Sequence, residues 1–178
     1  MKTKFYLICL FILAGFSNNV YSQVSFSHSL GASYFAGGHA AAPAITYSPR
    51  LNVVEMSDDM TVSVGTHLSL GLTIGEQGNS FALDAPAVAE FNFGHAATRN
   101  SDAAFGGFVG AGYGISRIGS QGAFGADFNE AAGPVLNGGI RALINDIPLT
   151  LRVSYMINTL DDASDVFGVG LFFNFGDF

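Results

Sequence analysis

One stretch of this sequence, Thr61–Gly75, alternates large apolar residues with small or polar ones for most of its fifteen residues. A period of two indicates a β-strand, because successive side chains leave a pleated backbone on opposite faces. Strands of soluble domains are mostly about 5 to 6 residues long, whereas a strand that crosses a bilayer at a tilt needs about 9 to 11. The pattern therefore predicts a long strand with an apolar environment on one side and with water or small groups on the other. The apolar set is Val62, Val64, Leu68, Leu70, Leu72 and Ile74, and the other set includes Ser63, Gly65, His67, Ser69 and Gly71.

The first part of the chain has the features of a secretory signal. Lys2 and Lys4 precede the apolar run Phe5–Phe16, which has the length of a signal-peptide core. A membrane anchor is disfavoured, because these twelve residues fall short of the roughly 17 to 25 that a spanning helix needs. We therefore predict a signal peptide over residues 1–22 and a single barrel domain over residues 23–178.

The charge and cysteine content of residues 23–178 exclude several classes of function. Five arginines, no lysine and fourteen carboxylates give a formal charge of −9, so nucleic acid is not an expected partner. Cys9 is the only cysteine and lies in the predicted signal peptide, which excludes disulfides, thiol catalysis and cysteine metal sites. The carboxylates near Asp161–Asp165 lack the glycine and distal glutamate of an EF-hand loop. We predict no metal site and no cofactor.

Extended segments recur along the chain, with turn residues between them and no convincing helical period. Eight strands are the smallest number in the usual range for a bacterial transmembrane barrel. The predicted fold class is therefore all-β, an eight-stranded antiparallel up-and-down transmembrane β-barrel. The longest connection expected on the extracellular side is Ile118–Ala131. The segments cover approximately residues 24–36, 42–53, 60–75, 81–93, 104–117, 132–144, 147–158 and 166–178.

The non-apolar face of these segments decides which way the sheet is turned. A soluble sandwich or ligand-carrying barrel buries its large apolar face and shows charged residues outside. Here the other face is mainly Gly, Ser, Thr and Ala, as in Gly106, Gly110, Gly112 and Gly114. Small groups suit the lining of a narrow barrel, so we expect the apolar face to contact lipid. A soluble lipocalin-like barrel that binds a small ligand stays open as an alternative.

The last segment, Gly168–Phe178, alternates and ends in an aromatic residue. With the signal peptide, the eight alternating segments and the absence of cysteine, the chain resembles the small eight-stranded outer-membrane barrels of the OmpA- and OmpX-like group. The resemblance implies a monomer in the cell outer membrane that contacts outer-membrane lipid. It also implies that the barrel assembly machinery recognises the last strand through Phe178, although the apolar row from Phe167 to Phe175 is out of phase with that residue.

Few ionisable residues fall on the inward face, and four of them lie near one rim: Arg50, Glu90, Arg141 and Arg152. If Ile144 lies opposite Leu149, Arg141 lies opposite Arg152, and two like charges at this spacing repel each other unless a carboxylate lies between them. We therefore predict an ion-pair layer in which Glu90 neutralises the arginines and closes the lumen. Solvated charges at an open rim are the alternative.

His67 and Ser69 share the inward face of their strand, and the next hairpin can bring Glu90 close to His67. A serine, a histidine and a carboxylate within reach form a nucleophile, a base and an orienting group. The set resembles that of the outer-membrane lipid A deacylase, which implies a lipid-modifying enzyme as an alternative. Residues on the inward face do not meet acyl chains from the lipid side, however. The main prediction is thus a barrel without catalysis and with a structural or interaction role.

Overall fold

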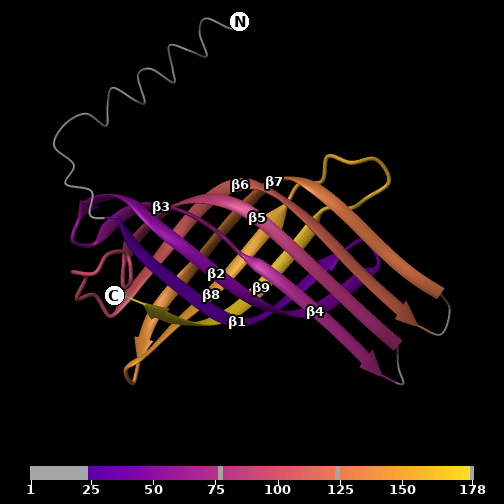
Figure 1. The fold of residues 1–178 in the computed structure, drawn as a ribbon, viewed down its shortest axis with the longest axis horizontal. Coiled ribbons are helices and arrows are strands. Elements are labelled where there is room, and N and C mark those ends of the chain that lie inside the picture. Colours follow the sequence, from indigo (N-terminus) through magenta and orange to yellow (C-terminus); the bar gives the residue numbers. More distant parts are fainter. Residues whose placement is uncertain (1–23, 76–77, 123–124, 177–178) are drawn as a thin grey trace, which may run out of the picture.

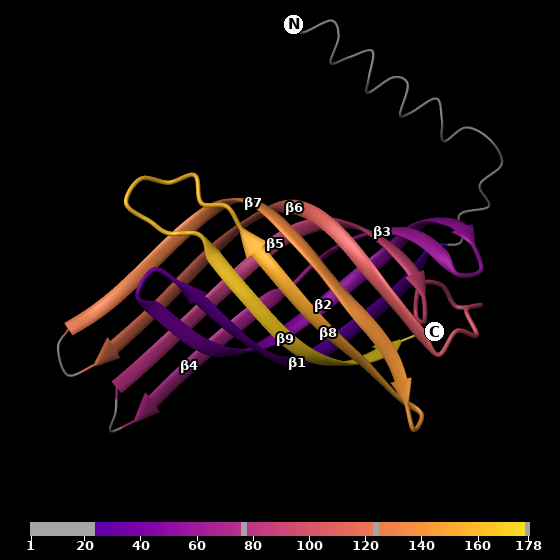
Figure 2. The same cartoon turned by 180° about the vertical axis from the view of Figure 1, so that it is seen from behind.

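The computed structural model describes residues 24–75, 78–122 and 125–176, and their strands form one sheet that closes on itself (Figures 1 and 2). Every neighbouring pair is antiparallel, and β1 pairs with β9 to complete the barrel. The predictions for the signal peptide and for Phe178 lie outside the described residues. The strands are β1 (Ser25–Gly37), β2 (Ala40–Ser57), β3 (Met60–Thr66), β4 (Leu68–Gly75), β5 (Gly78–Gly94), β6 (Phe105–Gly122), β7 (Gly125–Ile144), β8 (Ile147–Met156) and β9 (Val166–Gly176).

β3 and β4 are two parts of one strand that is interrupted at His67. Both parts pair with β2 on one side and with β5 on the other, and the register does not change between them. That register puts Pro49 opposite Thr66 and Pro86 opposite His67, and proline has no N–H to give to the ladder. The nine assigned strands therefore make an eight-stranded up-and-down barrel, which confirms the predicted fold class.

The barrel has two different rims. The start of β1 and the end of β9 meet at one of them, together with the Asp58–Asp59 turn, the 95–104 loop and the Asn145–Asp146 turn; we call it the chain-end rim. At the opposite end, which we call the hairpin rim, the β4–β5 and β6–β7 hairpins extend beyond the rest of the barrel (Figure 1).

The β6–β7 hairpin differs from the sequence prediction. β6 continues to Gly122 and β7 starts at Gly125, and these two residues pair. The expected long connection at Ile118–Ala131 is therefore wrong, because most of that segment belongs to paired strands. The glycines and polar residues that indicated a loop lie instead in the projecting ends of β6 and β7, where β6 also stays paired with β5 as far as Gln121.

The outward face of the barrel is apolar, as predicted. Leu70 and Leu72 are 62% and 70% exposed, whereas Ser63 and Ser69 are 0% and 2% exposed. The same alternation holds along β9, where Phe167, Leu171 and Phe173 point outward. No helix in the described part of the chain is long and apolar enough to cross a membrane.

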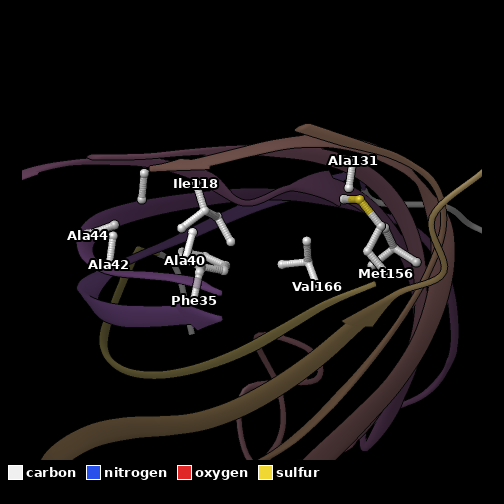
Figure 3. Packing of buried hydrophobic residues seen from close by; sticks show 10 residues of the cluster. Phe35, Ala40, Ala42, Ala44, Ile118, Ala131, Met156 and Val166 are labelled. Carbon is white, nitrogen blue, oxygen red and sulfur yellow. The ribbon is translucent and has the colours of Figure 1, made fainter. Parts of the chain in front are cut away.

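An apolar cluster fills the interior toward the hairpin rim (Figure 3). The sequence reasoning assigned only small and ionisable groups to the axis and missed this cluster. It closes the lumen in that half, because eight strands leave an interior only wide enough for side chains. We call it the inner apolar cluster, and it consists of Phe35, Ala40, Ala42, Ala44, Ala82, Ile118, Ala131, Val135, Met156 and Val166.

Candidate functional site in the barrel interior

Glu90 is the centre of a buried polar network toward the chain-end rim. Its Oε1 lies 3.1 Å from His67 Nε2 and accepts a hydrogen bond of 2.5 Å from Asn137 Nδ2. Asn137 Nδ2 is also 3.2 Å from His67 Nε2. These three side chains come from the β3–β4 break, from β5 beside it and from β7 on the far side of β6, so the network joins four consecutive strands of the barrel. All three are at least nine-tenths buried.

A glycine makes room for this network. Gly110 on β6 lies between Glu90 and Asn137 in the sheet register. A Cβ added to Gly110 would lie 2.5 Å from Asn137 Oδ1 and 2.8 Å from Glu90 Cγ. The glycines of β6 therefore allow large polar side chains of the neighbouring strands to meet inside the barrel, and they do not form a phosphate loop.

His67 contacts a serine, but not the serine that the sequence analysis nominated. Ser69 Oγ lies 2.8 Å from Thr46 Oγ1, whereas His67 Nδ1 lies 3.0 Å from Ser48 Oγ. A His67 that carries its proton on Nε2 donates to Glu90 and accepts from Ser48, which satisfies both ring nitrogens. The inward set is thus Ser48, His67 and Glu90, and the nomination of Ser69 is wrong because Thr46 takes its hydroxyl.

Arg50 joins the polar network to a loop that covers the chain-end rim. It donates to Ser27 Oγ, to Asn92 Oδ1 at 2.8 Å and to the Ala96 carbonyl at 2.7 Å. Ala96 belongs to the 95–104 loop, whose residues 95–98 are buried. Since the Asn52 amide reaches the next carbonyl, Ala97, this loop closes the barrel at the chain-end rim.

Arg141 and Arg152 each lie over an aromatic ring inside the barrel. The guanidinium carbon of Arg141 is 4.5 Å from the centre of the Phe108 ring, and that of Arg152 is 4.4 Å from the centre of the Phe172 ring. Such contacts stabilise a cation that has left water. Arg152 also donates to Ser48 Oγ at 3.2 Å.

The sequence analysis placed Arg141 opposite Arg152, and this register is wrong. Asn145 and Asp146 have φ values of 51° and 63° and form a two-residue turn, so Ile144 pairs with Ile147 and not with Leu149. Positive φ at both central residues is the signature of a type I′ hairpin. Arg141 therefore pairs with Thr150, and Arg152 pairs with Gly139.

The structure brings Arg50, Glu90, Arg141 and Arg152 into one region of the interior. Among the described residues, Glu90 forms its hydrogen bonds with His67 and Asn137, and no arginine reaches it directly. The arginines act on Glu90 by Coulombic attraction over a longer distance. Direct arginine–glutamate pairs are thus replaced by a layer in which neutral side chains separate the charges.

Sequence reasoning missed Ser48, Asn92 and Asn137. Ser48 shares the inward parity of Arg50, and Asn137 that of Arg141, so alternation would have found both. Nothing in the sequence marks the carbonyls of Ala96 and Ala97 as acceptors, because that contact depends on how the 95–104 loop folds. We call Arg50, His67, Glu90, Asn92, Asn137, Arg141 and Arg152 the polar layer.

A cavity of about 40 Å³ lies within the polar layer, and Ser48, His67 and Glu90 line it. A single water molecule needs about 10 to 15 Å³ by this kind of measure, so the cavity suits a few small molecules and excludes an acyl chain. Catalysis by Ser48 and His67 on a lipid would need a path that the packed interior does not offer. No group of three or more His, Asp, Glu or Cys side chains in the described residues is arranged to hold a metal ion.

No family model and no curated protein matches this sequence. Solved structures do match by fold. The attachment invasion locus protein Ail of Yersinia pestis, solved with the heparin analogue sucrose octasulfate, aligns over 85% of this chain and 99% of its own, with 11% identity and a TM-score of 0.55. Neisserial surface protein A aligns over 85% of this chain and 94% of its own, with 11% identity and a TM-score of 0.51.

The outer membrane enzyme PagL aligns less well, with 15% identity over 83% of this chain and a TM-score of 0.42. The shared feature of the Ail and NspA alignments is the closed eight-stranded barrel. At 11% identity, that likeness shows the fold of this chain. The protein has the fold of the small eight-stranded outer-membrane β-barrels, the group to which the OmpA- and OmpX-like proteins belong.

Proposed function

We propose that this protein is a closed outer-membrane barrel with a structural or interaction role and without catalysis. The observation that carries the proposal is that the interior is occupied at three successive levels. The inner apolar cluster fills the half toward the hairpin rim, the polar layer fills the other half, and the 95–104 loop covers the chain-end rim. Side chains that fill the lumen in this way stabilise the strands of the barrel and leave no path for solutes.

An interaction role is best supported at the hairpin rim, where the β6–β7 hairpin projects. Its outward face carries Phe128, which is 63% exposed, and a cross-strand ion pair of 2.9 Å between Arg117 and Glu130. This pair and the ring give a mixed apolar and charged surface. The formal charge of −9 over residues 23–178 disfavours a polyanion such as the heparin analogue bound to Ail.

The further partners of the proposal are outer-membrane lipid around the wall and the barrel assembly machinery at the last strand, through Phe178. The proposed state is a monomer, since β1 pairs with β9 and closes the sheet, which leaves unpaired strand edges in the projecting parts of β4 and β7. β1, β8 and β9 have 13, 10 and 11 residues and are shorter than β6 and β7. Their length would bring the hairpin rim close to the membrane surface, with the two projecting hairpins beyond it.

A lipid-modifying enzyme of the lipid A deacylase type is the second candidate. The Ser48–His67–Glu90 contacts favour it, because a base lies within hydrogen-bond distance of both a hydroxyl and a carboxylate. All three side chains are buried on the inward face. An acyl chain in the membrane therefore lies on the other side of the strands, and for this reason we place the enzyme second.

The proposal predicts a silent barrel in two assays. Purified protein in a planar bilayer is expected to give no stepwise conductance, with a trimeric porin in the same bilayer as the positive control. Incubation with lipopolysaccharide vesicles is expected to release no fatty acid. Steady conductance would contradict the closed lumen. Fatty-acid release that disappears in Ser48→Ala and persists in Ser69→Ala would establish the enzyme instead.

A further inference from the structure

The buried ionisable side chains of the interior do not balance in charge. Among the side chains whose burial the structure describes, they comprise three arginines, two carboxylates and two histidines. With neutral histidines, Arg50, Arg141 and Arg152 exceed Asp84 and Glu90 by one positive charge. An uncompensated buried charge is costly, so the excess calls for a further negatively charged partner, which the described buried side chains do not supply.

Arg141 is the arginine whose bonding is incomplete. It is 5% exposed, and its Nη1 is buried without a hydrogen-bond partner. Arg50, in contrast, donates from three nitrogens to three acceptors of the protein. A buried guanidinium nitrogen that donates to nothing loses its hydration without replacement. The missing acceptor therefore belongs at Arg141.

All three arginines line the same cavity of about 40 Å³. The guanidinium groups of Arg141 and Arg152 stack over the rings of Phe108 and Phe172, respectively. Stacking fixes the plane of a guanidinium and leaves its N–H edge for an acceptor. Glu90 also lines this cavity, but its Oε1 is engaged by His67 and Asn137.

We propose that this cavity binds one small monovalent inorganic anion of about the size of chloride. One negative charge matches the excess of the interior, and the cavity volume accommodates one such ion with one or two waters. A bulky organic acid exceeds that volume. The anion completes the bonding of Arg141 and lets three cations lie in one layer without a direct carboxylate partner. The proposal does not depend on whether the barrel conducts or acts on lipid.

The direct test uses bromide as a chloride substitute with anomalous scattering. Residues 23–178 are refolded in detergent and crystallised with sodium bromide as the only added halide. The proposal predicts an anomalous peak in the cavity beside Arg141. Density without an anomalous peak at that place, as expected for water alone, would overturn the proposal.

A stability measurement tests the same site in solution. The urea midpoint of unfolding is compared in sodium chloride and in sodium gluconate at equal ionic strength, because gluconate screens charge equally but is too large for the cavity. A bound anion stabilises the folded state by mass action, so the midpoint is expected to be higher in chloride. Equal midpoints in the two salts across the accessible concentration range would contradict the proposal.

Three variants test which residues cause the difference between the urea midpoints in chloride and in gluconate. Arg141→Gln is expected to abolish the difference between the two salts. Glu90→Gln removes a negative charge from the same cavity and is expected to increase the difference. Arg117→Gln changes an exposed arginine on the outer face of β6 and is expected to leave the difference as in the wild type. A chloride effect that persists in Arg141→Gln would place the anion elsewhere.

Discussion

Replacing Glu90 with alanine is expected to lower the free energy of unfolding by about 3 to 5 kcal/mol, the cost of leaving buried charges without their counter-charge. The carboxylate accepts from His67 and Asn137, it is the negative charge that attracts Arg50 and Arg141, and it attracts Arg152 together with Asp84. Without it, two buried donors lose their acceptor and the positive excess of the interior grows. The measurement is the urea unfolding of the barrel refolded in lipid vesicles. Unfolding is followed by far-UV circular dichroism, since the chain has no tryptophan, and by heat modifiability on gels.

The matched control is Glu130→Ala. Glu130 also pairs with an arginine, but this pair is more than half exposed, and exposed ion pairs contribute only about 0 to 1 kcal/mol. Glu90→Gln keeps the shape of the side chain and one acceptor oxygen, so its effect is expected to lie between those of the two alanine variants. Equal, small effects of Glu90→Ala and Glu130→Ala would show that the polar layer does not contribute to stability.

An arginine in place of Leu151 is expected to cost about 2 to 4 kcal/mol, the penalty measured for arginine at the lipid-facing midplane of a barrel. Leu151 lies in the middle of β8, between Ile140 of β7 and Leu171 of β9. All three side chains point outward. The reason for the penalty is that a guanidinium at this height has only acyl chains around it.

The control for Leu151→Arg is Leu160→Arg. The two leucines are similarly exposed, at 45% and 50%, but Leu160 lies in the 157–165 loop outside the strands. A transmembrane barrel is destabilised by the first change and tolerates the second. A soluble barrel would tolerate both, because each arginine would meet water. The pair of variants therefore separates exposure to lipid from exposure to water, which burial alone does not distinguish.

The strands and their faces could be predicted from the sequence because alternation depends on local geometry. In Thr61–Gly75 the structure buries most of the small or polar side, namely Thr61, Ser63, His67, Ser69 and Gly71, although the strand is interrupted at His67. Prolines of the two neighbouring strands cause that interruption, so the sequence of the strand alone does not reveal it. The ends of β6 and β7 were missed for a similar reason, since glycine and polar residues occur both in loops and in strands whose pairing with their neighbours continues, as that of β6 with β5 and β7 does.

Registers were harder to predict than faces. Residues 145 and 146 form the whole turn between β7 and β8, and this moves Arg141 from Arg152 to Thr150. The partner of His67 depends on register as well. Alternation placed His67, Ser69 and Glu90 on the inward face, yet Ser48 of the adjacent strand is the hydroxyl in contact with the ring. The identity of a contact inside a barrel follows from several registers together.

The inner apolar cluster was not predicted because alternation shows which residues face the interior but not which of them pack together there. Phe35 and Met156 occupy inward positions near strand ends, where neighbouring strands provide small alanines. Phe35 pairs with Ala42, and its ring lies where a Cβ on Gly168 of β9 would come within 2.9 Å of it. This complementarity joins residues far apart in the sequence, so it becomes visible only once the barrel is closed.

The central claim is that the apolar face of the sheet contacts lipid and the small, polar face contacts the axis. Because Cys9 is the only cysteine of the chain, single cysteines in residues 23–178 can carry nitroxide labels without background, and their collision rates with oxygen and with a water-soluble nickel complex can be measured in vesicles. Labels at Val64, Leu68, Leu70 and Leu72 are expected to collide with oxygen, which concentrates in the bilayer, while labels at Ser63 and Ser69 are expected to be shielded from it. The opposite pattern, with Leu68 and Leu70 shielded and Ser63 and Ser69 open to the nickel complex, would contradict the account.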